Sequence, residues 1–203
     1  TDRPSGDTAR LRNVLRTIGR QAQHASLTGA LEGGEARSAR QYNHILGVLV
    51  SDGLLDDPVY RAAFPPLPDD INYDGIGMSA GLLRKCLDAA EEDVENGVSH
   101  PYRSAHHVLR GVGRMAEHSS LTGHLSGGRP GLVALYNAVE SSLVGAGVVR
   151  AGLFEPLDAE NGTMGEVAVA AQHLAAYVAE GFDEPEAQLP DLPRVGRELH
   201  DIG

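Results

Sequence analysis

Apolar residues recur along the chain at the three- and four-residue spacing that places them on one face of an α-helix. One stripe follows the capping candidate Asp7, a second follows Gly33-Gly34, and a third runs through residues 82–90. The three stripes consist of Leu11, Val14, Leu15, Ile18 and Ala22, of Ala39, Tyr42, Ile45, Leu46, Leu49 and Val50, and of Leu82, Leu83, Cys86, Leu87 and Ala90. No segment alternates apolar and polar residues as a half-buried strand does. The pattern predicts an all-α protein.

The same pattern occurs twice in the chain. Residues 14–53 align with residues 108–147 at a constant offset of 94 without a gap, and 19 of the 40 aligned pairs are identical. Chance identity at an average composition is several-fold lower. We interpret the repeat as an internal tandem duplication of a unit with about three helices, and we expect the two units to pack as a helical bundle about a pseudo-twofold axis.

The duplication also sets the expected domain organisation. The first helical repeat takes residues 1–96 and the second takes residues 97–181, while residues 182–203 contain several prolines and are expected to form an extended tail. In each repeat the first helix is expected to end at a glycine, Gly29 or Gly123, because glycine readily adopts the left-handed conformation that terminates helices.

Composition argues against several classes of function. The formal net charge of −11 is unsuited to a nucleic-acid-binding protein, because phosphate backbones are bound by clustered positive charge. No stretch approaches the roughly 18–20 consecutive apolar residues of a membrane-spanning helix. Aromatic residues make up 4% of the chain and tryptophan is absent, so we expect no cofactor. A single cysteine, Cys86, and a preference for arginine over lysine favour a bacterial, cytoplasmic protein.

A line of polar residues on the first helix recurs in the second repeat. Its members are spaced four residues apart, so they share one helix face, which points away from the apolar stripe. The recurring residues are Arg16, Arg20 and His24 with Arg110, Arg114 and His118, and, on the next helix, Tyr42 and Asn43 with Tyr136 and Asn137. Guanidinium groups bind carboxylate and phosphate. If the repeats face each other across a twofold axis, these side chains predict an anion-binding site at the seam between them.

The same recurrence has a structural alternative. The arginines can pair with aspartate or glutamate across an interface, and a histidine near the end of a helix can interact favourably with the helix dipole. Ser26 and Thr28, which recur as Ser120 and Thr122, can satisfy terminal backbone groups of the same helices. Two copies of one fold need the same structural contacts, so the sequence leaves both alternatives open.

One short motif points to a metal. Asp70, Asn72 and Asp74 are followed by Gly75 in the D-x-N-x-D-G order that opens an EF-hand calcium loop. The last position of such a loop needs a bidentate acid, and in this chain it is Gly81. The motif is thus an incomplete calcium loop, and a turn that caps the following helix is the alternative.

Two hypotheses of function follow. The first is a non-catalytic helical module that binds a protein partner or a small anion at the seam, which the absence of catalytic motifs from the sequence favours. The second is an enzyme with a site shared between the repeats, in which His24 or His118 is the general base, the arginines bind the substrate, and Tyr42 and Tyr136 donate hydrogen bonds. Either hypothesis allows a homodimer. The sequence identifies neither the ligand nor the partner.

Overall fold

The computed structural model describes residues 5–95 and 102–180 of the 203-residue chain. Within these residues the protein consists of α-helices and one 3-10 helix, with no strand, which confirms the predicted all-α class. The elements are α1 (Ser5–Thr28), α2 (Glu35–Ser51), α3 (Pro58–Ala63), α4 (Tyr73–Glu95), α5 (Arg103–Thr122), the 3-10 helix η1 (Ser126–Gly128), α6 (Arg129–Gly145) and α7 (Met164–Glu180). The expected tail, residues 182–203, lies outside the described residues.

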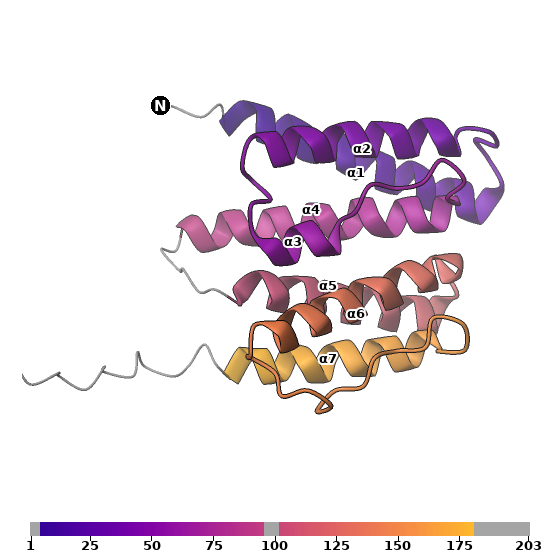
Figure 1. Ribbon diagram of the computed structural model, residues 1–203. Coiled ribbons are helices and arrows are strands. Elements are labelled where there is room, and N and C mark those ends of the chain that lie inside the picture. The colour runs from indigo at the N-terminus through magenta and orange to yellow at the C-terminus, as the bar shows by residue number, and fades with distance from the viewer. Residues whose placement is uncertain (1–4, 96–101, 181–203) are drawn as a thin grey trace, which may run out of the picture.

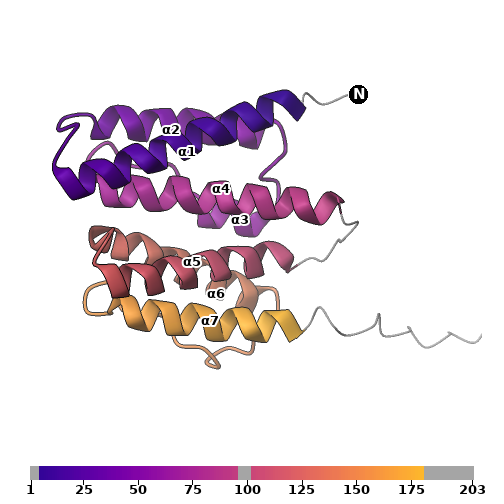
Figure 2. The same cartoon turned by 180° about the vertical axis from the view of Figure 1, so that it is seen from behind.

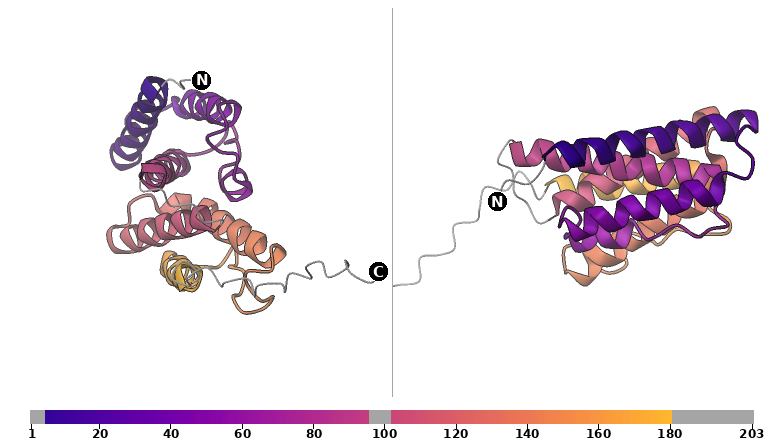
Figure 3. Two further views of the ribbon diagram at one scale, coloured as in Figure 1. Left: turned by 90° about the vertical axis from the view of Figure 1, so that its left-hand side faces the viewer. Right: turned by 90° about the horizontal axis from the view of Figure 1, so that it is seen from above.

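The helices form two layers (Figures 1 and 2). In the first layer α1, α4, α5 and α7 lie side by side, because α1 packs on α4, α4 on α5, and α5 on α7. The second layer contains α2, α3 and α6, which the end-on view in Figure 3 shows along the other side. No helix in the described ranges is long and apolar enough to cross a membrane.

The order of the helices does not confirm the expected twofold arrangement. A twofold axis between the repeats would either place equivalent helices together, α1 against α5 or α4 against α7, or match any α4–α5 contact with an α1–α7 contact, and none of these three pairs makes a substantial contact. Instead α4, the last main helix of the first repeat, packs on α5, the first helix of the second repeat. α1 and α5 also run in the same direction (Figure 1). The repeats therefore follow one another head to tail, and α4 lies between their first helices.

Glycines end α1 and α5 at the positions that the sequence predicts. Gly29 and Gly123 have positive φ angles of 70° and 71°, and each donates its backbone N–H to the carbonyl four residues earlier. Thr28 and Thr122 complete these ends in the same way, since each hydroxyl donates to a carbonyl of the preceding turn and accepts a backbone N–H from two residues later. α1 begins at Ser5, so the capping candidate Asp7 lies inside the helix.

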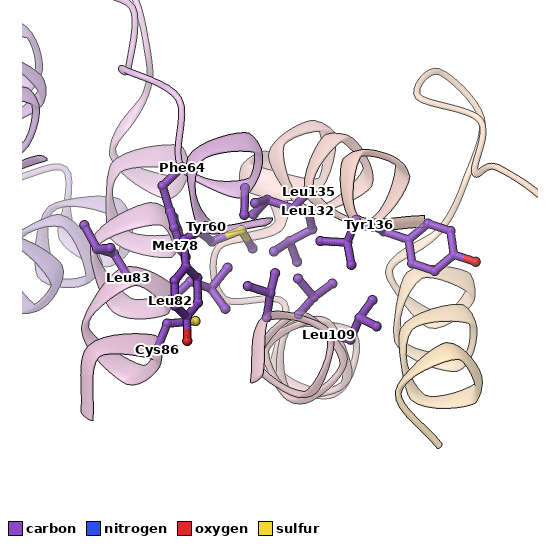
Figure 4. Close-up of a cluster of buried hydrophobic side chains, with 14 of the residues drawn as sticks. Tyr60, Phe64, Met78, Leu82, Leu83, Cys86, Leu109, Leu132, Leu135 and Tyr136 are labelled. Carbon is purple, nitrogen blue, oxygen red and sulfur yellow. The ribbon is translucent and has the colours of Figure 1, made fainter. Parts of the chain in front are cut away.

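Buried apolar side chains from both repeats meet in the centre of the molecule. Figure 4 shows Met78 and Leu82 of α4, Leu109 of α5 and Leu132 of α6 in one cluster. Leu82 is fully buried and lies against Gly111 of α5, where a Cβ atom would be 2.6 Å from the Leu82 Cδ2 atom. The absence of a side chain on Gly111 therefore lets α4 and α5 approach closely at the seam.

Candidate functional site

The predicted arginine lines lie on the outer surface of the first layer. Arg16 and Arg20 are exposed on α1, and Arg110 and Arg114 are exposed on α5. Because α4 lies between these two helices (Figure 2), the lines flank α4 instead of facing each other across a twofold axis. This placement brings side chains of α4 between the two lines.

A groove with a volume of about 240 Å³ lies over α4 between α1 and α5. Its lining includes Arg16 and Arg20 of α1, Arg84 of α4 and Met115 of α5. Glycines line its floor, and a Cβ atom on Gly77 of α4 would lie 3.3 Å from a methyl group of α1. The small residues thus let α1 and α4 pack closely, and the arginines form the rim of the groove.

α4 adds positive charge between the arginine lines. Lys85 adjoins Arg84 and lies near Arg114 of α5, and its pKa is lowered by burial and, next, by the charges of these two arginines. One surface of α1, α4 and α5 therefore carries five cationic side chains, and we call it the cationic face. It consists of Arg16, Arg20, Arg84, Lys85 and Arg114.

Three arginines of the cationic face have no acidic partner among the residues that the structure describes. Arg84 forms an ion pair with Asp88, with 2.7 Å between Nη1 and Oδ2. Arg16, Arg20 and Arg114 form neither a hydrogen bond nor an ion pair with any described residue. For these three positions, the pairing that the structural alternative requires is therefore absent from the described part of the chain.

The same helices do form ion pairs where acids are available. Arg12 of α1 reaches Glu91 of α4, with 2.9 Å between Nη2 and Oε1, and lies 3.4 Å from Asp88. The hydrogen bond to Glu91 is the main cause of the raised pKa of Arg12. Arg16 and Arg20, one and two turns further along α1, instead face the glycine-lined groove.

The histidines of the two lines do not line the groove. His24 and His118 occupy the last turns of α1 and α5, where their backbone carbonyls accept hydrogen bonds from the threonine hydroxyls that complete the helix ends. The His118 ring contacts the ring of His124, with 6.2 Å between centroids. The recurrence of histidine therefore coincides with the recurring helix ends.

Asn43 and Asn137 each hold the segment that leads into the last helix of a repeat. The Asn43 side chain accepts the backbone N–H of Leu67 at 2.7 Å and donates to the Leu67 carbonyl at 2.8 Å. Asn137 makes the same two bonds with Leu157, at 2.8 and 3.0 Å. These bonds give both asparagines a structural role.

A short motif marks the two clamped segments. Residues 64–67 and 154–157 both read Phe-x-Pro-Leu, but they are offset by 90 instead of 94 residues. The gapless alignment of the repeats therefore does not include this motif. Extending the alignment with a gap of four residues is the signal that could have identified the clamped segments from the sequence.

Replacing Asn43 by Ala is expected to destabilise the protein by about 1–2 kcal/mol, because two backbone groups of Leu67 lose their partner at once. Asn137→Ala should have an effect of the same sign and similar size. Chemical denaturation measures both changes. Asn13→Ala, on the exposed side of α1, is the control, and equal stability of the Asn13 and Asn43 variants would contradict the clamp.

The tyrosines lie away from the arginines. Tyr42 and Tyr136 are buried on α2 and α6, in the second layer. Tyr42 lines a cavity of about 670 Å³ between the α3–α4 connection and α6, which we call the seam cavity. Among the described residues, this cavity shares no lining residue with the groove of the cationic face. The tyrosines and arginines of the enzyme hypothesis therefore line different sites.

The residues of the incomplete calcium loop have structural partners at the start of α4. The Asn72 side chain accepts the backbone N–H of Gly75 at 2.8 Å. Asp74 accepts a hydrogen bond from the Ser26 hydroxyl of α1 and another, at 2.8 Å, from the backbone N–H of Gly127 in η1. Among the residues that the structure describes, no three metal-ligating side chains gather in one place. The geometry favours the capping turn.

A polar cluster at the seam was not predicted from the sequence. His107 of α5 lies 3.4 Å from Asp93 of α4 and 3.4 Å from the hydroxyl of Tyr60 in α3. Burial lowers the pKa of His107 and lowers that of its neighbour His106 to about 4. The neutral forms are thus favoured, and the cluster joins three helices through polar contacts that become adjacent only in the fold.

Comparisons with known proteins add no functional information, since no protein-family model, no curated protein and no solved structure matches the chain. Function is therefore inferred from the geometry of the described residues. The chain as a whole is acidic, with a net charge of −11, whereas the cationic face gathers positive charge on one surface. This contrast makes the cationic face the candidate site.

Proposed function

We propose that this protein is a non-catalytic helical module that binds an acidic segment of a partner protein on the cationic face. The observation that carries the proposal is the lack of acidic partners for Arg16, Arg20 and Arg114 among the described residues. The chain has 28 acidic and 17 basic residues, so acids are not scarce. Unpaired guanidinium groups that share one surface are suited to bind carboxylates, often through two parallel hydrogen bonds.

The shape of the cationic face favours an extended ligand over a small one. The groove holds about 240 Å³, less than the roughly 300–1,000 Å³ of typical small-molecule pockets. Its cations come from three helices, so one small anion could contact only some of them. A peptide segment with several aspartates or glutamates could contact the whole face.

Electrostatics gives such binding two properties. Bound carboxylates would relieve the repulsion among Arg84, Lys85 and Arg114, which contributes to the lowered pKa of Lys85. The charges at the rim are exposed, so the affinity should fall as the salt concentration rises.

Replacing Arg20 and Arg114 together by Ala is expected to weaken the binding of a fluorescein-labelled oligoglutamate peptide by about tenfold or more, because exposed ion pairs contribute up to about 1 kcal/mol each. Fluorescence anisotropy at low ionic strength measures the affinity. Arg37→Ala with Arg150→Ala is the matched control, since both arginines are exposed, lie outside the groove and carry the same total charge.

Four results would contradict the proposal. The wild-type protein could fail to bind the peptide, or the control pair could lose as much affinity as the test pair. Circular dichroism provides the third check, because a loss of helix in the Arg20 and Arg114 variant would assign these arginines a structural role. Competition by inorganic phosphate at low concentration would show that a small anion is the better ligand.

We also infer that residues 1–96 and 97–181 arose from one duplicated helical unit. The matching glycine ends of α1 and α5 support this inference, as do the two asparagine clamps, which make the same bonds in equivalent segments. No observation on the described residues favours the enzyme alternative, because the arginines and the tyrosines that it needs line separate sites.

A further inference from the structure

The groove of the cationic face has an apolar floor beneath its charged rim. The rim consists of the arginines of α1 and α4 together with Gln23, and no acidic side chain is present in the described lining. The floor consists of glycines and three apolar residues, the buried Leu15 and the half-buried Met115 and Leu125. Carboxylates can bind the rim, but a charged group placed on the floor would lose hydration without gaining a partner there. The floor therefore fits a different kind of group from the rim.

The two half-buried apolar side chains of the floor come from the second repeat and lie against glycines of α4. The Met115 Cε atom is 3.4 Å from the position that a Cβ atom on Gly81 would take. The Leu125 Cδ2 atom is at the same distance from the Cβ position of Gly77. Because α4 lies between α1 and α5 (Figure 2), side chains of the second repeat complete a groove that begins at α1 of the first. The head-to-tail order of the repeats thus builds the apolar floor.

Gly81 has an equivalent in the second repeat. Gly19 of α1 aligns with Gly113 of α5 in the duplicated sequence. A Cβ atom on Gly19 would lie 4.0 Å from the backbone nitrogen of Gly81, and one on Gly113 would lie 3.6 Å from the backbone nitrogen of Gln172 in α7. Gly81 and Gln172 therefore occupy matching places beside the first helices of their repeats.

The Gln172 side chain covers the corresponding surface of the second repeat. Its Cγ atom lies 3.1 Å from the Cβ position of Gly113, and its Nε2 atom donates a hydrogen bond to Glu117 Oε2 at 3.1 Å. Glu117 aligns with Gln23, which lines the groove of the first repeat. The second repeat thus covers this surface with its own side chain, whereas Gly81 leaves it open in the first repeat.

The open groove has room for one side chain of a partner. An apolar cavity of about 150 Å³ holds a benzene molecule, so a groove of about 240 Å³ accommodates a side chain of the size of leucine. We propose that the acidic partner segment carries a leucine or methionine that enters the groove, while carboxylates on both sides of it bind the arginines at the rim. This inference rests on the proposed function, since it specifies the ligand of the same face.

Two fluorescein-labelled peptides of equal charge test the proposal. Each has three glutamates on either side of a central residue, which is leucine in one peptide and serine in the other. The wild-type protein is expected to bind the leucine peptide about three- to tenfold more tightly, because partial burial of a leucine side chain favours binding. Fluorescence anisotropy measures both affinities. The ratio between them should persist as the salt concentration rises, although both affinities fall.

Gly81→Gln places the side chain of the second repeat over the groove and should reduce the ratio of the two affinities to about one. Glutamine favours a helix over glycine, and the Cβ atom would make an ordinary contact of 3.4 Å with Met115, so the fold should be retained. Gly47→Gln is the matched control, because Gly47 is exposed on α2, and it should leave the ratio unchanged. Met115→Gln, which introduces the aligned residue Gln21 of the first repeat, should also lower the ratio and serves if Gly81→Gln does not fold.

The results separate this proposal from the proposed function. Equal affinities of the wild-type protein for the two peptides would overturn the apolar subsite and leave the binding of acidic segments intact. No binding of either peptide would contradict the proposed function and the subsite together. A leucine preference that persists in both Gly81→Gln and Met115→Gln would also overturn the subsite, since the leucine would then bind elsewhere.

Discussion

Leu82→Ala is expected to lower the free energy of unfolding by about 3–4 kcal/mol, because truncating a fully buried leucine loses apolar contact and leaves a cavity. Leu82 lies at the seam between α4 and α5, in a cluster that both repeats share (Figure 4). Chemical denaturation measures the change. Leu121→Ala is the matched control, since Leu121 is 81% exposed on α5 and its truncation should change stability by less than about 0.5 kcal/mol.

A second substitution at the seam makes this prediction specific. In the wild-type protein, a methyl group on Gly111 would lie 2.6 Å from the Leu82 Cδ2 atom, so Gly111→Ala should destabilise by about 1–2 kcal/mol through overpacking. In the Leu82→Ala protein the same methyl group can occupy the vacated space, and alanine also favours the helix over glycine. Gly111→Ala should therefore stabilise that variant. Additive effects in the double-mutant cycle would show that the two positions are not in contact.

Asp74→Ala is expected to destabilise the protein by about 2–3 kcal/mol, because the carboxylate accepts hydrogen bonds from two other elements. One donor is the Ser26 hydroxyl of α1, and the other is the backbone N–H of Gly127 in η1. The substitution removes the link among three elements and leaves both donors without this partner. Asp74→Asn keeps one acceptor oxygen and should restore part of the stability. Thermal and chemical denaturation measure both variants.

Asp70→Ala is the control for this substitution. Asp70 is exposed, and its carboxylate has no hydrogen bond to another described residue, so the expected change is less than about 0.5 kcal/mol. Added calcium distinguishes the two interpretations of the loop. If Asp74 serves to join the helices, calcium should leave the melting temperature unchanged. A calcium-dependent rise in melting temperature that disappears in both Asp74→Ala and Asp70→Ala would support the metal site instead.

The helices could be predicted from the sequence because their signals are local. Each apolar stripe needs only its own spacing, and the ends of α1 and α5 follow from a single residue type, as Gly29 and Gly123 show. The capping candidate Asp7 was wrong because nothing in its neighbourhood excludes a helix that begins earlier, at Ser5. Local signals thus predict that a helix is present more reliably than they predict its first residue.

The packing of the repeats could not be predicted in this way. An alignment of the two repeats identifies the residues that both share. The contact between the repeats instead depends on residues that differ from one repeat to the other. Gly111 of α5 lies against α4 at the seam, and so does Met115, whose Cε atom would lie 3.4 Å from a Cβ atom on Gly81. The aligned residues of the first repeat are Thr17 and Gln21. From the sequence alone, these differences look like the neutral substitutions of a solvent-exposed surface. Only the packing of α4 on α5 shows that they lie at the contact between the repeats.

The sequence indicated only the α1 and α5 members of the cationic face. Its α1 and α5 members could be identified because they recur. Arg84 and Lys85 lie on α4, and α7, the last helix of the second repeat, contains neither arginine nor lysine. A search for recurring residues therefore misses them. Their proximity to Arg114 depends on α4 lying between α1 and α5, which only the order of the helices reveals.

The head-to-tail order also gives the molecule two unlike ends. α1 forms one end, and α7 forms the other, where Val169 and Tyr177 are 51% and 42% exposed. When two molecules bind through the same end, they form a closed dimer. When the α1 end of one molecule binds the α7 end of another, each added molecule still has a free end, so assembly continues into a filament. Substitutions that make α7 self-complementary should therefore stop at dimers. Substitutions that make α1 complementary to α7 should produce polymers without a defined length.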